Sequence, residues 1–210
     1  MKAMLLPVVA VVVLGVWCGA GSAVEHGKEG KEGHEKLLQM LPNSSVSLSE
    51  GVRKLMGNST ETPFVAKFKV SDKGELLLCV FVAEKGFETP IEKNVLKAIS
   101  TNVEAGKWKP ETASLTDSKH LAWATERFKL MSSSHESLLD ALARAENDHK
   151  GATIAAIYAM AKDGKPEFLV RYVEGHKLAE AWYDFGEGKK VTGKNKEWVP
   201  YGSTYGAPYK

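Results

Sequence analysis

The sequence predicts an α+β protein of two tandem repeats offset by 90 residues, each a helical hairpin packed on an antiparallel β-sheet. Three observations support this prediction. Each half contains a serine-capped helical pattern, two runs with apolar residues at alternate positions follow it, and a glycine-containing turn separates those runs. A helical hairpin covering one face of such a sheet buries the amphipathic surfaces of both layers.

The first residues resemble a secretory signal peptide. Lys2 precedes the apolar run MLLPVVAVVVLGVW, and the small residues Gly-Ser-Ala end at Ala23. The run is shorter than the about 20 apolar residues of a membrane-spanning helix. Lipid attachment at Cys18 is disfavoured because the bulky Trp17 precedes it. We therefore expect residues 1–23 to be removed, the protein to be secreted or periplasmic, and no stable membrane span to remain.

The net charge limits the kinds of partner to expect, and the cysteine count limits the use of disulfides for stability. The chain has 28 Lys and Arg against 26 Asp and Glu, a formal net charge of +2, and so no excess of charge that would favour nucleic acid. Without residues 1–23 the only cysteine is Cys79, so no intramolecular disulfide is expected. Its place in an apolar run predicts a buried thiol, and the alternative is a reactive or intermolecular one.

The repeats align without a gap at the 90-residue offset. Ser47 falls on Ser137, and an acid three residues after each predicts a capping box. Alternating apolar residues over 64–70 and 154–160 predict strands, and Gly74 and Gly164 predict hairpin turns. The expected organisation is a signal peptide at 1–23, a flexible linker at 24–34, a first repeat at 35–116, a second at 117–200 and a C-terminal tail at 201–210.

The two repeats are similar before the capped helix but differ after the hairpin. Apolar residues predict a helical arm before each capped helix, namely Leu37, Leu38 and Leu41 in the first repeat and Leu121, Phe128 and Met131 in the second. The second repeat has a clear third strand, with Ala181, Tyr183 and Phe185 on one face. The equivalent residues of the first repeat have helical spacing, at Ile91, Val95, Leu96 and Ile99, which leaves its third strand open.

Residues 138–191 resemble a PepSY domain. The helix LLDALARA, the hairpin KDGKPEFLVRYV and the ending YDFGEGKKV carry the resemblance, which in the first repeat extends only over 48–82. The tandem arrangement with a helical hairpin is similar to β-lactamase-inhibitor-like folds. The resemblance implies a secreted or periplasmic protein without catalysis, because PepSY domains occur in metallopeptidase propeptides and are thought to restrain peptidases.

Motifs that carry chemistry are missing from the sequence. It contains no HExxH, GxSxG, P-loop or CxxC pattern, and its histidines are scattered. We therefore expect no enzyme, no catalytic residue, no metal site and no cofactor.

The candidate binding surface comprises aromatic residues and one acid, namely Trp108, Trp182, Tyr183, Asp184 and Trp198. Trp108 and Trp198 occupy equivalent places with a proline two residues on, which suits either a binding hot spot or a structural anchor. Asp184 is a candidate contact residue by its resemblance to the PepSY ending, or simply part of a turn.

Three functional hypotheses follow, and the least favoured is an enzyme whose catalytic groups are brought together only by folding. The first is a non-catalytic PepSY-like binding module that restrains or recognises a peptidase or another exported protein, for which a continuous exposed apolar or aromatic patch is expected. The alternative is a small-ligand or metal carrier that uses the cleft between the repeats, for which a pocket lined by converging polar groups is expected. Neither the partner nor the oligomeric state follows from the sequence.

Overall fold

The computed structural model describes residues 26–134, 136–185 and 190–191. The first half forms α1 (His26–Met40), η1 (Leu41–Asn43), α2 (Leu48–Met56), β1 (Thr62–Val70), β2 (Leu76–Ala83), η2 (Ile91–Lys93), β3 (Leu96–Asn102) and β4 (Glu111–Ser114). The second forms α3 (Ser118–Met131), α4 (Leu138–Asp148), β5 (Thr153–Lys162), β6 (Lys165–Glu174), β7 (Lys177–Asp184) and β8 (Lys190–Val191). The predicted signal peptide and C-terminal tail lie outside the described residues. None of the described helices is long and apolar enough to cross a membrane.

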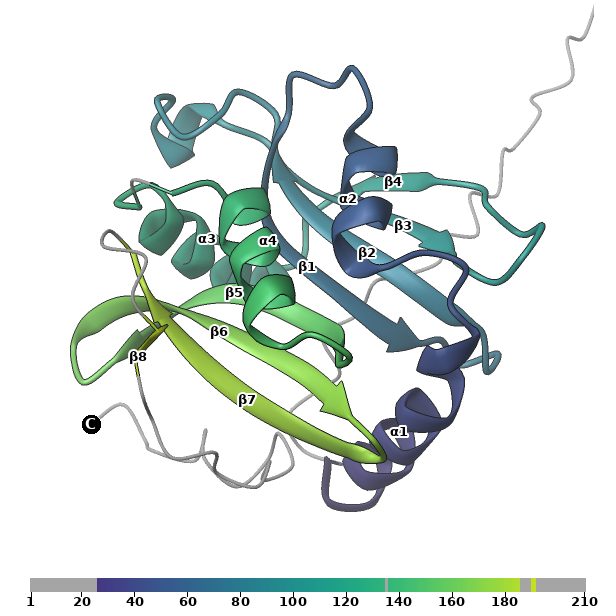
Figure 1. Cartoon of the computed structure of the whole chain (residues 1–210). Coiled ribbons are helices and arrows are strands. Elements are labelled where there is room, and N and C mark those ends of the chain that lie inside the picture. The colour runs from purple at the N-terminus through teal and green to yellow at the C-terminus, as the bar shows by residue number, and fades with distance from the viewer. Residues whose placement is uncertain (1–25, 135, 186–189, 192–210) are drawn as a thin grey trace, which may run out of the picture.

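The fold is α+β, as predicted, but the strands form one sheet instead of one sheet per repeat. Its order is β4-β3-β2-β1-β5-β6-β7-β8, and every neighbouring pair is antiparallel (Figure 1). Pairing of β1 with β5 joins the halves, with Val65, Ala66 and Lys67 opposite Tyr158, Ile157 and Ala156. The order of helices and strands is the same in both halves, whereas the 90-residue repeat itself stays a prediction.

The helices cover both faces of the sheet, which corrects the expectation that a hairpin covers one face. Gly51 of α2 lies so close to Leu78 that a Cβ there would be 2.5 Å from its Cδ2, and α4 packs beside α2 (Figure 1). Phe81, which points to the opposite face of β2, contacts Trp123 of α3 with ring centroids 5.3 Å apart. All of β2 is consequently buried, as its unbroken apolar sequence requires.

The predicted caps and turns are largely present. Glu50 N–H donates to the Ser47 hydroxyl and Ser47 N–H donates to the Glu50 carboxylate, which completes the first capping box. At α4 the Ser137 hydroxyl accepts from Asp140 N–H, but the shorter Asp140 carboxylate accepts from that hydroxyl instead of from the Ser137 backbone. Gly74 (φ 75°) and Gly164 (φ 76°) adopt the positive φ that the hairpin turns require.

Two predicted segments differ from the structure. The linker expected at 24–34 is helical from His26 onward, because α1 packs its C-terminal apolar residues against the sheet and the Lys and Glu residues before them are good helix formers. The helical spacing from Ile91 to Ile99 does not produce a helix beyond the single turn η2. Residues 96–102 instead pair with β2, so the first half does have a third strand.

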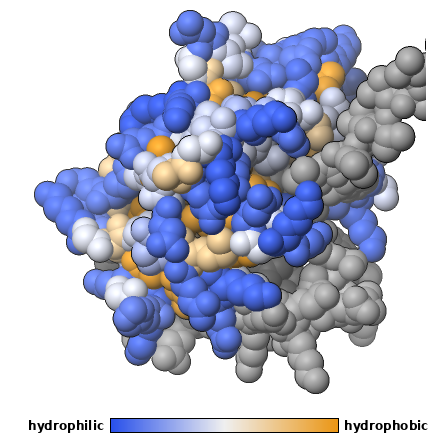
Figure 2. Space-filling view, turned by 90° about the vertical axis from the view of Figure 1, so that its right-hand side faces the viewer, coloured by the Kyte–Doolittle hydropathy of each residue, from blue (hydrophilic) through white to orange (hydrophobic). Residues whose placement is uncertain are grey.

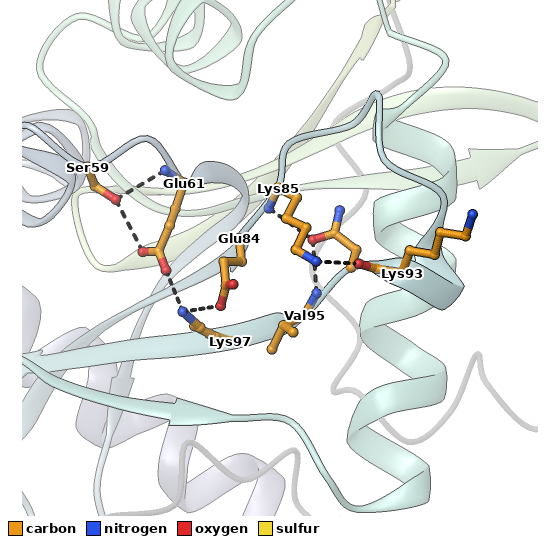
Figure 3. Close-up of polar contacts among 8 residues, drawn as sticks. Ser59, Glu61, Glu84, Lys85, Lys93, Val95 and Lys97 are labelled. Carbon is orange, nitrogen blue, oxygen red and sulfur yellow. Dashed lines mark hydrogen bonds and ion pairs between the residues drawn. The ribbon is translucent and has the colours of Figure 1, made fainter.

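The long connection between β2 and β3 is held by its own polar side chains (Figure 3). The Asn94 side-chain oxygen accepts from the backbone N–H groups of Lys85 and Val95, both at 3.0 Å. Lys97 forms ion pairs with Glu61 at 3.0 Å and Glu84 at 2.6 Å. These contacts fix the connection, which the second half replaces with a tight turn between Glu174 and Lys177.

Candidate functional site

The residues of the predicted binding surface are not brought together. Trp182 and Tyr183 are neighbours on β7 and therefore point to opposite faces of the sheet. Tyr183 is fully buried on the α4 side, with the Arg144 guanidinium 4.9 Å from its ring centroid. Burial, with Asp148 nearby, raises the pKa of the Tyr183 hydroxyl. Tyr183 therefore contributes to the core and not to an exposed contact surface.

The remaining predicted residues lie apart from one another. Trp108 is partly buried in the β3–β4 connection, and the Lys54 ammonium lies 3.9 Å from its ring centroid, which ties that connection to α2. The Asp184 backbone oxygen accepts from Arg144 at 3.4 Å, and its carboxylate lies 3.9 Å from the same guanidinium. Trp198 lies outside the described residues. A binding role for these side chains stays a prediction.

A continuous exposed apolar patch, which the partner hypothesis anticipated, is not found in the described part of the chain. Of the large apolar residues there, only Val95 and Leu121 are exposed. Figure 2, which views the molecule from the right-hand side of Figure 1, shows apolar atoms in separate areas between hydrophilic ones. The described residues therefore do not form the broad exposed apolar area that this hypothesis expected.

The α3 side of the sheet carries a row of residues that meet across its centre. Directly opposite residues on neighbouring antiparallel strands share a face, and the pairing places Cys79, Lys67, Ala156, Arg171 and Glu180 in one row across β2, β1, β5, β6 and β7. Two cations therefore flank the small Ala156. This row is the centre of the candidate site.

Aromatic rings surround the lysine of this row. The Lys67 Nζ lies 5.5 Å from the Trp123 ring centroid and 5.6 Å from that of Phe81, within the range of a cation–π contact. The Arg171 guanidinium lies 5.6 Å from the Tyr158 ring, and Tyr158 in turn lies 6.4 Å from Trp123. We call these residues, Lys67, Phe81, Trp123, Tyr158 and Arg171, the Lys67 cluster.

Positive charge predominates in the Lys67 cluster. Arg171 Nε donates to the Glu180 carboxylate at 2.9 Å, whereas no hydrogen bond or ion pair joins the half-buried Lys67 ammonium to any residue that the structure describes. Burial, helped by the charges of Lys69 and Arg171, lowers the pKa of Lys67 from 10.5 to about 8. A lysine with a strongly lowered pKa is a recognised indicator of a functional site.

Helices α1 and α3 border the cluster, and α3 adds a further cation. Arg127 of α3 is buried, forms an ion pair with Glu126, and has its guanidinium 5.1 Å from the Trp123 ring. His34 of α1 has a lowered pKa, chiefly because of burial and then because of the Arg171 charge. The positive charges therefore come from Lys67 and Arg171 on two strands and from Arg127 on α3, whereas the lowered pKa of His34 favours its neutral form.

Cys79, which lies opposite Lys67, is buried as predicted. In the full chain Cys79 is assigned to a disulfide, whereas the expectation of an unpaired cysteine concerns the chain without residues 1–23 and stays a prediction.

A groove of about 400 Å³ lies where the two halves meet on the α2–α4 side. The first half lines it with residues 41–42, 44–48 and 50. The second half lines it with Glu146 and residues 152–154. Beside it, the Ser49 hydroxyl donates to the Glu146 carboxylate at 2.8 Å and so joins α2 to α4. This groove lies at the junction of the two halves, where a cleft was expected, and its role as a ligand site stays a prediction.

The Lys67 cluster was not among the predicted site residues. The alternation in FVAKFKV places Lys67 on the polar face of β1, where a lysine normally contacts solvent. The available signal was the unbroken apolar run of β2, which indicates a sheet covered on both faces. Chemically, an ammonium and a guanidinium beside aromatic rings can bind an anion, whereas the described residues contain no group of three or more His, Cys, Asp or Glu arranged to hold a metal ion.

Comparisons with known proteins identify no family. No protein-family model matches the chain, and no curated protein matches it. Among solved structures, it is similar to the crystal structure of a "putative lipoprotein" from Clostridium difficile 630, with 11% identity, a TM-score of 0.37, and coverage of 73% of this chain and 95% of that one. A similarity at this level carries no argument about function, so the PepSY resemblance stays a prediction.

Proposed function

We propose that this chain is an exported, non-catalytic binding protein that recognises a peptidase or another exported protein through the Lys67 cluster. The signal-like residues 1–23 support export, and the PepSY resemblance of 138–191 supports a binding role without catalysis. Mature residues from 24 onward are then secreted or periplasmic.

The observation that carries this proposal is the Lys67 ammonium, placed among aromatic rings without a carboxylate partner in the described residues. Partly buried charges are normally paired, because desolvation of an unpaired charge costs free energy. A partner protein that places an anion beside the Lys67 ammonium would explain why a cation is kept at this position. Tryptophan, tyrosine and arginine, which Trp123, Tyr158 and Arg171 provide, are the residue types that dominate binding hot spots.

Affinity capture with a matched pair of variants tests this proposal. Immobilised residues 24–210 are exposed to exported proteins of the native host, as wild type, as Lys67→Met, and as Lys73→Met, whose lysine lies at the exposed β1–β2 turn. We expect one exported protein to be retained by the wild type and by Lys73→Met but lost with Lys67→Met. If that protein is a peptidase, its activity should fall on titration. Equal retention by all three, or none by any, would overturn the proposal.

The groove between the halves supports a second function, that of a small-ligand carrier. Serine hydroxyls and the carboxylates of Glu50 and Glu146 line it together with apolar groups, a combination typical of ligand sites. A small molecule that raises the melting temperature of the wild type, but not that of Glu146→Gln, would favour the carrier. An unchanged response in Glu146→Gln would exclude this groove as its site.

A further inference from the structure

We infer that Lys67 and Arg171 form a site for a carboxylate attached to an aromatic or apolar group, bound over Ala156. The inference rests on the proposed binding function and specifies the chemistry that the partner presents. Lys67 and Arg171 both lie directly opposite Ala156, one on each side, so the three residues share a face. Ala156, whose methyl side chain is short, therefore lies between the two longer cationic side chains.

The balance of charge in the row favours a monovalent anion. Lys67 and Arg171 contribute two positive charges, and the carboxylate within the row is that of Glu180, which already accepts from Arg171 Nε. The Lys67 ammonium has no carboxylate partner among the described residues, and a single carboxylate from a ligand would neutralise it. The mutual repulsion of Lys67 and Arg171, which helps to lower the pKa of Lys67, would be relieved by the same anion.

The neighbouring row of the sheet indicates what the carboxylate is attached to. Phe81, Val65, Tyr158, Leu169 and Trp182 lie opposite one another on β2, β1, β5, β6 and β7, on the same face as the cations. Trp123 of α3 lies above this row, in contact with Phe81 and Tyr158. A ligand that places its carboxylate over Ala156 therefore extends toward aromatic rings. An aromatic residue that carries a carboxylate, such as a C-terminal phenylalanine, has this combination of groups.

Two matched probes separate the contributions of charge and ring. N-acetylphenylalanine carries the carboxylate, and N-acetylphenylalaninamide has the same ring without the charge. Both are titrated by calorimetry or NMR into residues 24–210 as wild type and as Lys67→Met, Lys67→Arg and Lys73→Met. We expect only the acid to bind wild type. Lys67→Met should weaken it at least about tenfold, as loss of a charge-assisted hydrogen bond predicts, Lys67→Arg should restore most of the affinity, and Lys73→Met should leave it unchanged.

The pH dependence provides an independent readout. As pH rises through about 8, the free protein loses the Lys67 charge, so the affinity for the acid should fall in wild type and not in Lys67→Arg. The other charged groups facing this position are Lys69 on β1, Arg171 on β6, Glu180 on β7, Arg127 on α3 and His34 on α1.

The possible outcomes distinguish the inference from the proposed function. If acid and amide bind equally, if inorganic phosphate binds better than the acid, or if Lys67→Met binds the acid as wild type does, the carboxylate site is refuted. Capture of an exported protein in a Lys67-dependent manner would then still support the proposed function. Conversely, Lys67-dependent binding of the acid without a captured protein would support the site and overturn the protein-binding proposal in favour of a carrier.

Discussion

Replacing Lys67 with methionine should stabilise this protein near neutral pH. Methionine keeps most of the apolar volume of the lysine side chain and removes a charge that has no carboxylate partner among the described residues. The folded-state pKa of about 8, against an ordinary value of 10.5, corresponds to an upper limit of about 3.4 kcal/mol for the cost of keeping the lysine charged. Because Lys67 is only half-buried, we expect a gain of about 1–3 kcal/mol in the free energy of unfolding.

The sign of the pH dependence follows from the lowered pKa of Lys67. Below about pH 8 the lysine is charged in both the folded and the unfolded state, so its full cost is present. Between pH 8 and 10.5 the folded state releases the proton while the unfolded state keeps it, and stability therefore rises with pH. From pH 7 to pH 9 this contribution is about 1.3 kcal/mol.

Urea denaturation at pH 7 and pH 9 measures this effect. Lys67→Met should be more stable than wild type at pH 7, and the difference between the two should shrink by about 1 kcal/mol at pH 9. Other titrating groups cancel in the difference, and Lys73→Met serves as the surface control. A Lys67→Met protein less stable than wild type at pH 7, or a difference independent of pH, would refute the argument. A more stable variant that no longer binds its partner would identify Lys67 as a residue kept for function at a cost in stability.

Three further substitutions test the fold. Asn94→Ala removes the acceptor for two backbone N–H groups of the β2–β3 connection. It should lower the free energy of unfolding by about 1–3 kcal/mol and speed proteolytic cleavage within that connection. Faster cleavage throughout the sheet would contradict a local role. Gly51→Val introduces side-chain atoms close to Leu78 and should lower the free energy of unfolding in urea by about 1–3 kcal/mol. The control Gly33→Ala, at a glycine with open space around it, should leave that free energy unchanged or raise it. Equal effects of the two substitutions would disprove the close packing at Gly51. Ser49→Ala loses the hydrogen bond between α2 and α4 and should lower stability by about 1 kcal/mol, and no change in thermal unfolding would show that this bond contributes nothing.

Errors in the predicted fold occurred where a local pattern competed with long-range pairing. Residues 91–99 have helical apolar spacing, yet Leu96–Asn102 satisfies its backbone by pairing with β2. The start of α1 has the composition of a linker, but the helix continues because its C-terminal turns pack on the sheet. In both segments contacts with distant residues outweighed local propensity.

The elements that depend on near neighbours were predictable from local sequence patterns. The Ser47–Glu50 cap, the alternation of 64–70 and the turn at Gly164 each involve residues within a few positions of one another. The class of fold followed from their order.

The way the halves join and the position of the candidate site depend instead on contacts between distant parts of the chain. Lys67 and Arg171 meet because β1 and β6 both pair with β5, and Trp123 reaches them because α3 packs on the face that the alternation had marked as polar. The physical reason is that strand order and the face chosen by a helix depend on burial summed over the whole sheet. No local pattern in one strand contains that information.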